Sequence, residues 1–306
     1  MAYSYLANEA ETREVIDRYD LVSKHRLGQN FLVDDSVIGR ILGLAELTSD
    51  DVVLEVGPGI GTLTVALLPR VQAVCSIEAD AALAPVLEDT CEAYNERLTV
   101  VVGDALRMDG NDVTHALAAD GVNKLPNKLV SNLPYQVAAT VILRYLGEMN
   151  NLERAVVMVQ AEVADRIAAK PNTKAYGAYT IKLALLARVT GRFEVDSRSF
   201  LPAPHVDSAV VRLDRERACD PITAEPLDDA RVKRISRVVD AAFAQRRKTI
   251  LNSLSSTLAG APNKPELAEI LASCGISPTC RAETLPPEAF VRLERALTLE
   301  QAPDQA

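Results

Sequence analysis

A glycine-rich segment after an apolar run is the first feature with chemical meaning. The segment Leu54-Glu-Val-Gly-Pro-Gly-Ile-Gly61 places glycines at Gly57, Gly59 and Gly61. Glycine permits a tight turn that brings backbone close to a ligand. A dinucleotide fingerprint, which serves to bind a pyrophosphate, would need its third glycine at position 62, where this chain has Thr62. The spacing therefore favours a nucleotide-like cofactor without phosphate, such as S-adenosylmethionine.

Two acidic residues follow the next apolar runs. Glu78 ends the second run, and Asp104 follows the third. A carboxylate at position 78 can accept hydrogen bonds from both ribose hydroxyls, and one at position 104 can accept a hydrogen bond from an adenine amine. Either acid alone is equally explained as a cap of the turn after its strand. Together with three glycines they favour a cofactor site, because ligands of open α/β sheets bind along the carboxyl edge.

The segment Ser131-Asn-Leu-Pro-Tyr135 follows the fourth apolar run with an amide, a carbonyl and an aromatic ring. The N6 nitrogen of adenine becomes nucleophilic when acceptors hold its hydrogens, and we expect Asn132 Oδ1 and the Pro134 carbonyl to do so. In-line transfer of a sulfonium methyl then depends on positioning and needs no titrating base. Tyr135 can stack on one face of the base and Phe200 on the other. Both rings are alternatively ordinary core aromatics.

A parallel sheet is needed to bring these residues together. Apolar runs alternate with helical stretches, as such a sheet requires, at Val52–Val56, Ala73–Ile77, Leu98–Val102, Lys128–Ser131 and Ala155–Val159. The spacing predicts an amphipathic helix over Asp34–Ala45 and a strand near a sheet edge over Val206–Leu213. From Arg231 onward only helical patterns occur. We expect an α/β fold with a Rossmann-like sheet and a small C-terminal all-helical domain.

Positive charge is concentrated in one segment of an acidic chain. The formal net charge is −9, yet the segment between Arg231 and Thr257 contains seven Lys or Arg residues and only one acidic residue. Phosphate binding depends on such cations. We expect Arg246, Arg247 and Lys248 to lie on a helix and to contact RNA. The alternative is a solvated helix face.

Length and composition set the domain organisation. A chain of 306 residues with 48% hydrophobic content can form one large and one small domain. We expect an N-terminal extension over 1–20, a cofactor-binding catalytic domain over 21–215, a linker over 216–230, a helical RNA-binding domain over 231–298 and a tail over 299–306.

Several classes of site are not supported. The five cysteines form no Cys-x-x-Cys pair and the three histidines lie far apart, so we expect neither a disulfide framework nor a metal site. The N-terminus lacks a basic region followed by an apolar stretch, and no run of about 18 apolar residues occurs. We expect a cytoplasmic protein without a membrane partner.

Six segments between about Lys24 and Leu297 together resemble the ribosomal RNA adenine dimethyltransferases of the KsgA type. They are Arg26-Leu-Gly-Gln-Asn-Phe-Leu32, the glycine segment, Asn132-Leu-Pro-Tyr135, Val159-Gln-Ala-Glu-Val-Ala-Asp-Arg166, Phe200-Leu-Pro-Ala-Pro-His-Val-Asp-Ser-Ala-Val211 and Arg246-Arg-Lys-Thr-Ile-Leu-Asn252. His205 and Gln136 depart from the residues common at these places in the family.

The resemblance implies a class I methyltransferase using S-adenosylmethionine, with cofactor contacts from Asn30, Leu32, Gly57, Glu78, Asp104 and Asn132. It also implies the substrate: two adjacent adenosines in a hairpin loop near the 3′ end of small-subunit (16S) RNA, each methylated twice on N6, within an assembling 30S-type particle. We expect a monomer.

Two other functions stay open from the sequence. One is an N6-methyltransferase of large-subunit RNA, as in the related macrolide-resistance proteins. The other is an RNA-binding assembly factor that has lost catalysis. The segments Phe200–Val211 and Arg246–Asn252 favour the small-subunit enzyme over the first, and the intact glycine, acid and Asn132 positions argue against the second.

Overall fold

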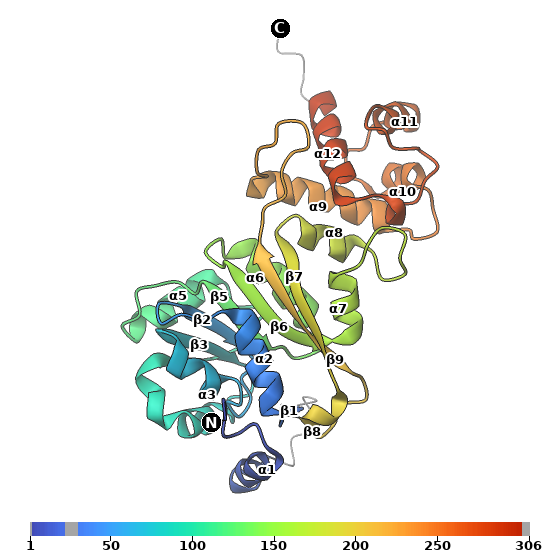
Figure 1. The fold of residues 1–306 in the computed structure, drawn as a ribbon. Coiled ribbons are helices and arrows are strands. Elements are labelled where there is room, and N and C mark those ends of the chain that lie inside the picture. The colour runs from blue at the N-terminus through green and yellow to red at the C-terminus, as the bar shows by residue number, and fades with distance from the viewer. Residues whose placement is uncertain (1, 22–29, 302–306) are drawn as a thin grey trace. The chain divides into compact units, whose positions relative to one another are not determined.

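The computed structural model describes residues 2–21 and 30–301. The chain divides into two compact units, shown in Figure 1. The first comprises Met1–Ala164 and Val189–Arg215, and the second comprises Asp165–Arg188 and Glu216–Ala306. One division of the chain falls after residue 215, and the segment Asp165–Arg188 clusters with the C-terminal unit.

Helices and strands alternate along the chain up to residue 160, two helices and three further strands follow up to residue 215, and the elements after it are helical. The strands are β1 (Phe31–Leu32), β2 (Val52–Val56), β3 (Ala73–Glu78), β4 (Leu98–Val102), β5 (Lys128–Asn132), β6 (Arg154–Gln160), β7 (Ala187–Val195), β8 (Phe200–Leu201) and β9 (Ser208–Arg215). The helices are α1 (Glu9–Arg18), α2 (Asp35–Ala45), α3 (Thr64–Leu67), α4 (Ala84–Thr90), α5 (Gly110–Ala119), α6 (Ala138–Glu148), α7 (Ala161–Ile167), α8 (Ala178–Ala184), α9 (Asp229–Phe243), α10 (Ile250–Thr257), α11 (Lys264–Ser273) and α12 (Pro287–Gln301). Short 3-10 turns are η2 (Leu68–Arg70), η3 (Glu92–Arg97), η4 (Ser197–Ser199) and η5 (Ala282–Thr284).

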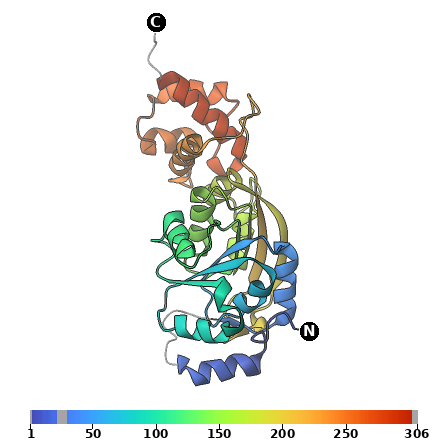
Figure 2. The same cartoon turned by 90° about the vertical axis from the view of Figure 1, so that its left-hand side faces the viewer.

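The first unit is built on a seven-stranded sheet of order β4-β3-β2-β5-β6-β9-β7. The five strands from β4 to β6 are parallel, and β9 pairs antiparallel with β6. Helices cover both faces of the sheet, as Figures 1 and 2 show together. The prediction of an α/β, Rossmann-like sheet is confirmed, and the five predicted parallel strands are all present.

Local sequence explains where these elements form. Every residue of β2 and β3 is buried, as expected for parallel strands covered on both faces. Helix α2 begins after Asp34, whose carboxylate accepts from the backbone N–H of Ser36, and it buries its apolar stripe. The predicted strand near the edge became β9, with β7 outside it. The sequence reading missed β7, a strand of mostly half-buried and exposed residues.

The second unit is helical and includes α8. The segment before α8 is tied to the C-terminal part of the chain by backbone contacts. Asn172 N donates to Glu283 O at 2.9 Å, and Tyr176 Oη donates to Leu285 O at 2.7 Å. These bonds explain why Asp165–Arg188 clusters with the helices rather than with the sheet.

Ion pairs also stabilise the second unit. Asp220 lies 1% exposed and accepts from Arg231 at 2.7 Å and from Arg295 at 3.0 Å. Glu294, 2% exposed, accepts from Arg231 and Arg234. Burial acts to raise the pKa of Asp220, but its backbone and arginine donors outweigh burial and lower it. The predicted linker over 216–230 therefore contributes a buried carboxylate to the helical unit.

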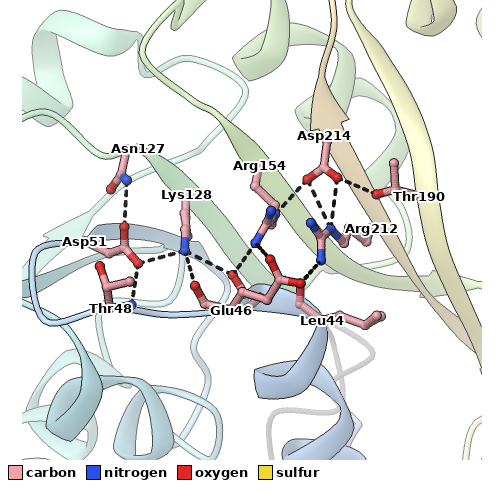
Figure 3. Close-up of polar contacts among 11 residues, drawn as sticks. Leu44, Glu46, Thr48, Asp51, Asn127, Lys128, Arg154, Thr190, Arg212 and Asp214 are labelled. Carbon is pink, nitrogen blue, oxygen red and sulfur yellow. Dashed lines mark hydrogen bonds and ion pairs between the residues drawn. The ribbon is translucent and has the colours of Figure 1, made fainter.

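Three cationic side chains contact the C-terminus of α2 at the amino edge of the sheet (Figure 3). Glu46, the residue after α2, has a φ of 48° and ends the helix. The contacts to the last carbonyls are Lys128 Nζ to Glu46 O at 2.6 Å, Arg154 Nη1 to Ala45 O at 3.0 Å and Arg212 Nη1 to Leu44 O at 3.2 Å. Cations at a helix C-terminus are favourable because they offset its partial negative charge.

Carboxylates complete this cluster. Asp214 accepts from Arg154 Nε at 2.7 Å, from Arg212 Nε at 3.1 Å and from Thr190 Oγ1 at 2.7 Å. Burial acts to raise the pKa of Asp214, but the hydrogen bonds from Arg212, Arg154 and Thr190 outweigh it and lower the pKa to about 2. The ionised carboxylate thus stabilises the folded state.

We predict that Asp214→Asn lowers the free energy of unfolding by about 2 kcal/mol at pH 7. The lowered pKa means that the contribution is complete above the unfolded pKa near 4 and disappears as the pH falls through about 2. Urea unfolding of both proteins between pH 2 and pH 7 measures the difference. Asp50→Asn, at an exposed position near the same edge, is the control. A deficit for Asp214→Asn that does not shrink in acid would contradict the assignment.

Candidate functional site

The carboxyl ends of four neighbouring strands form the candidate site. Strands β4, β3, β2 and β5 are adjacent and parallel, so Asp104, Glu78, Gly57 and Asn132 all lie at one sheet edge. From β2 the chain runs outward through β3 to β4 and then returns to β5 on the other side of β2. The strand order therefore reverses between β2 and β5. Ligands of open α/β sheets bind at such a switch point.

The strands β2 and β5 diverge toward this edge. Their register covers only Val53↔Lys128 and Leu54↔Leu129. Beyond it, Ser131 Oγ accepts from Val56 N at 3.2 Å and donates to Val56 O at 2.5 Å. One buried hydroxyl thus satisfies both backbone groups that the separated ladder leaves without partners.

The glycine segment forms a turn at the end of β2. Gly57, Gly59 and Gly61 have φ values of 70°, 60° and 89°, a region that disfavours residues with a side chain. A Cβ on Gly57 would lie 2.9 Å from Cγ of Pro134. The turn therefore packs directly against the Asn-Leu-Pro-Tyr segment, and the two predicted motifs meet.

Glu78 is tied to the glycine turn. Its side chain accepts from Gly59 N at 3.2 Å and from Asp80 N at 2.9 Å, and the residue is 5% exposed. Burial raises the pKa of Glu78, and the backbone N–H donors offset only part of that effect. The structure places this carboxylate beside the glycine turn.

Asp104 is more open. Its carboxylate accepts from Leu106 N at 2.9 Å and lies 3.6 Å from Arg107 Nε, while half of the side chain is exposed. The first contact is a local cap, which was the alternative explanation for this acid. The remaining acceptor capacity faces solvent and stays available to a ligand.

The Asn132 amide and two neighbouring carbonyls differ in their hydrogen bonding. The Asn132 side chain is half-buried and makes no hydrogen bond to the parts of the chain that the structure describes. The Pro134 carbonyl already accepts from Val137 N and Ala138 N, both at 3.1 Å, which occupies its two lone pairs. The Leu133 carbonyl accepts no hydrogen bond within residues 2–21 and 30–301. Leu133 therefore suits the second acceptor role better than Pro134, which the sequence reading had chosen.

Tyr135 is held at the edge by a contact with β9. Its Oη lies 2.6 Å from Oγ of Ser208, which is fully buried at the start of that strand. Burial raises the pKa of Tyr135, so the phenol stays protonated and able to donate. The bond restrains the ring of Tyr135 at this edge.

Phe200 and Leu32 lie in the hydrophobic core. They pair across the two-stranded β1–β8 sheet and are 4% and 3% exposed, within one cluster. Phe200 is therefore a core aromatic here, and the predicted stacking on a base lacks an exposed ring face. Leu32 can offer only its backbone to a ligand, and Asn30 precedes it half-buried. Residues Arg26–Gln29 of the same motif lie outside the described part of the chain.

The prediction that the basic segment at residues 246–248 lies on a helix is wrong. Arg246, Arg247 and Lys248 lie in the turn between α9 and α10, because Thr249 caps α10 through a bond from Asn252 N. All three are exposed and make no ion pair with any described residue. In the same segment Arg231 and Arg234 are already neutralised by Asp220 and Glu294. The free positive charge is thus smaller than the sequence count.

Sequence reasoning missed Glu55, Ser131 and Ser208. Glu55 is 1% exposed on β2, and its Oε2 accepts from Thr64 Oγ1 at 2.7 Å and Ser76 Oγ at 2.9 Å. Burial raises the pKa of Glu55 to about 7. A charged residue inside an otherwise apolar strand was the available signal. Ser208 stood within a motif, but nothing local in the sequence pointed to Tyr135.

Within residues 2–21 and 30–301, no group of three or more His, Cys, Asp or Glu side chains is arranged to hold a metal ion. No described helix is long and apolar enough to cross a membrane.

Comparison with solved structures gives neighbours over most of the chain. A dimethyladenosine transferase from Plasmodium falciparum is similar with a TM-score of 0.68 and 26% identity, over 86% of this chain and 95% of that one. The 23S rRNA methyltransferase ErmE is similar with a TM-score of 0.61 and 30% identity, over 88% of this chain and 100% of that one.

Sequence comparison is more specific. Ribosomal RNA small subunit methyltransferase A of Bacillus cereus (strain B4264) and that of Bacillus mycoides (strain KBAB4) are each 38% identical over 298 residues, covering 97% of this chain and 98% of theirs. The family described as ribosomal RNA adenine dimethylase matches residues 21–298. The chain belongs to the ribosomal RNA adenine dimethylase family.

Proposed function

We propose that this chain uses S-adenosylmethionine to dimethylate N6 of two adjacent adenosines in a hairpin loop near the 3′ end of small-subunit rRNA. The observation that carries the proposal is the packing of Pro134 on Gly57, which puts the cofactor turn and the Asn132–Tyr135 segment at one edge. Family membership and relatives named as small-subunit methyltransferases support the substrate. The substrate within an assembling subunit, a cytoplasmic location and a monomeric state are parts of the same proposal.

The residues at the edge fit S-adenosylmethionine, which supplies an electrophilic methyl group when bound. The glycine turn offers close backbone without side chains, and Glu78 offers a carboxylate for ribose hydroxyls. Asp104 retains acceptor capacity one strand further. S-adenosylmethionine carries no phosphate, so it requires no phosphate-binding helix N-terminus, and helix α3, which begins after the turn, has only four residues.

Asn132 and Leu133 then act on the target nitrogen. The Asn132 amide oxygen and the Leu133 carbonyl accept the two N6 hydrogens, which directs the nitrogen lone pair toward the methyl group. Both acceptors lack partners among the described residues, so they need no rearrangement. Tyr135, anchored by Ser208, stacks on the base.

Removal of the Asn132 amide tests this chemistry. We predict that Asn132→Ala lowers kcat for methyl transfer to small subunits by about a hundredfold, because one preorganised acceptor is lost at the reacting nitrogen. Binding of the subunit is expected to stay within about twofold of wild type, since phosphate contacts supply most affinity. Labelled methyl incorporation and a filter-binding assay measure the two. Transfer at a normal rate would remove Asn132 from the mechanism.

The Tyr135–Ser208 contact gives a second test. Tyr135→Ala loses base stacking of about 2 kcal/mol and is expected to lower kcat/KM about thirtyfold. Tyr135→Phe and Ser208→Ala each remove only the hydrogen bond, so smaller losses are expected, and the double variant should be no worse than either one. Fully additive losses would show that Ser208 does not act through the tyrosine.

The exposed cations of the α9–α10 turn are the proposed RNA contacts. We predict that changing Arg246, Arg247 and Lys248 together to Ala makes the plot of log binding constant against log salt concentration less steep. The magnitude of its negative slope should fall by about 2, because three phosphate contacts are lost. The control neutralises Arg13, Arg97 and Arg188, each already paired with a carboxylate. An unchanged slope for the first variant would refute the role.

The large-subunit alternative keeps one specific observation in its favour, the similarity to ErmE. Incubation with labelled cofactor and purified small or large subunits separates the two functions. Methyl incorporation into large-subunit RNA alone would overturn the proposal, and dimethyladenosine in small-subunit RNA would support it.

A further inference from the structure

The N-terminal arm, residues 2–21, lies against the elements that form the cofactor turn. Leu6 and Val15 share one buried cluster with Ile60, Leu83 and Val86. Ile60 is the residue between Gly59 and Gly61, and it is fully buried. The Ile60 side chain therefore helps to anchor the turn to the body of the protein, and the arm supplies part of the packing around it.

A chain of hydrogen bonds connects the arm with the same turn. Tyr5 Oη donates to Thr90 O at 3.0 Å, and Thr90 Oγ1 donates to Ile60 O at 2.9 Å. Helix α4 packs closely on the turn there, since a Cβ on Gly61 would lie 2.9 Å from Leu87 and 3.0 Å from Thr90. The position of Thr90 thus determines where the Ile60 carbonyl lies.

The arm itself is firmly placed. Its first residues bind the start of α2, where Asp35 accepts from Tyr3 N at 2.9 Å and Ser4 N at 2.9 Å. Gly39 leaves room for the Tyr3 ring on α2, because a Cβ there would lie 2.5 Å from the ring. Helix α1 begins at the cap Asn8, and its Arg18 lies 3.5 Å from Asp89 on α4. The arm therefore links α2, the glycine turn and α4.

We propose that the arm is a positioning element for the cofactor: it holds Ile60 and Thr90 so that the glycine turn is preorganised to bind. The arm touches no reacting atom, so its effect is on cofactor affinity and not on the chemical step. Preorganisation increases affinity because the free turn then loses less freedom on binding. The inference rests on the proposed cofactor site and names what positions it.

The test compares Leu6→Ala with wild type in the full chain. Calorimetry with S-adenosylmethionine is expected to show a Kd about tenfold higher, the size of a typical coupling between sites. The kcat at saturating cofactor should stay within about twofold, and Leu6→Met, which keeps the volume, should restore the affinity. Tyr5→Phe, which removes only the hydrogen bond to Thr90, should weaken binding about threefold.

Two controls separate positioning from loss of stability. Arg13→Ala changes the exposed face of α1 and should leave the affinity unaltered. Leu267→Ala, in the core of the helical unit, lowers stability without touching the turn and should also leave it unaltered. An affinity loss in Leu267→Ala equal to that in Leu6→Ala, or no loss in Leu6→Ala, would overturn the inference.

Hydrogen exchange without cofactor gives an independent measurement. Leu6→Ala should increase amide exchange in residues 57–62 while β5 and β6 keep their protection. If wild type binds no S-adenosylmethionine, the proposed function fails, yet exchange still decides whether the arm orders the turn. Unchanged exchange in residues 57–62 would contradict the positioning role.

Discussion

The divergence of β2 from β5 is the constraint on which the rest of the site depends. At a switch point between parallel strands, the segments that follow the two strands turn away in opposite directions, and ligands of open α/β sheets bind between them. Here the ladder stops at Leu54 and Leu129, and the Ser131 hydroxyl takes over both backbone groups of Val56. The opening is thereby made without leaving a buried polar group unsatisfied. The glycine turn and the Asn132 segment emerge on its two sides and meet through Gly57 and Pro134.

The buried acids around this opening have different tasks because their partners differ. Glu55 faces the hydroxyls of Thr64 and Ser76 inside the fold, and its pKa of about 7 shows that ionisation is costly there. Glu78 faces backbone N–H groups of the turn, which favour its charged form although burial opposes it. The first acid joins β2, β3 and α3, whereas the second presents a carboxylate to the edge. Residue type alone does not distinguish these roles.

Much of the sheet could be predicted from sequence because burial on both faces leaves continuous apolar runs. The run Val52–Val56 and the glycines after it predicted the strand and its glycine turn from local information alone. Strand β7 was missed because its residues are mostly exposed or half-buried, so the apolar signal was weak. The turn at Arg246–Lys248 was taken for helix because the cap Thr249 was not recognised. The places of Phe200 and Ser208 could not be predicted from local sequence. The core that buries Phe200 and the bond from Ser208 to Tyr135 join segments far apart in sequence.

The internal pairing of Arg231 and Arg234 with Asp220 and Glu294 has a consequence for how such a protein chooses among RNAs. Cations held by buried carboxylates do not attract phosphates from a distance, and the chain as a whole carries a net charge of −9. General attraction to the abundant transcripts of a cell is therefore low, so little of the protein is sequestered on irrelevant strands. For the proposed function, selectivity then depends on short-range fit to a folded RNA rather than on net charge.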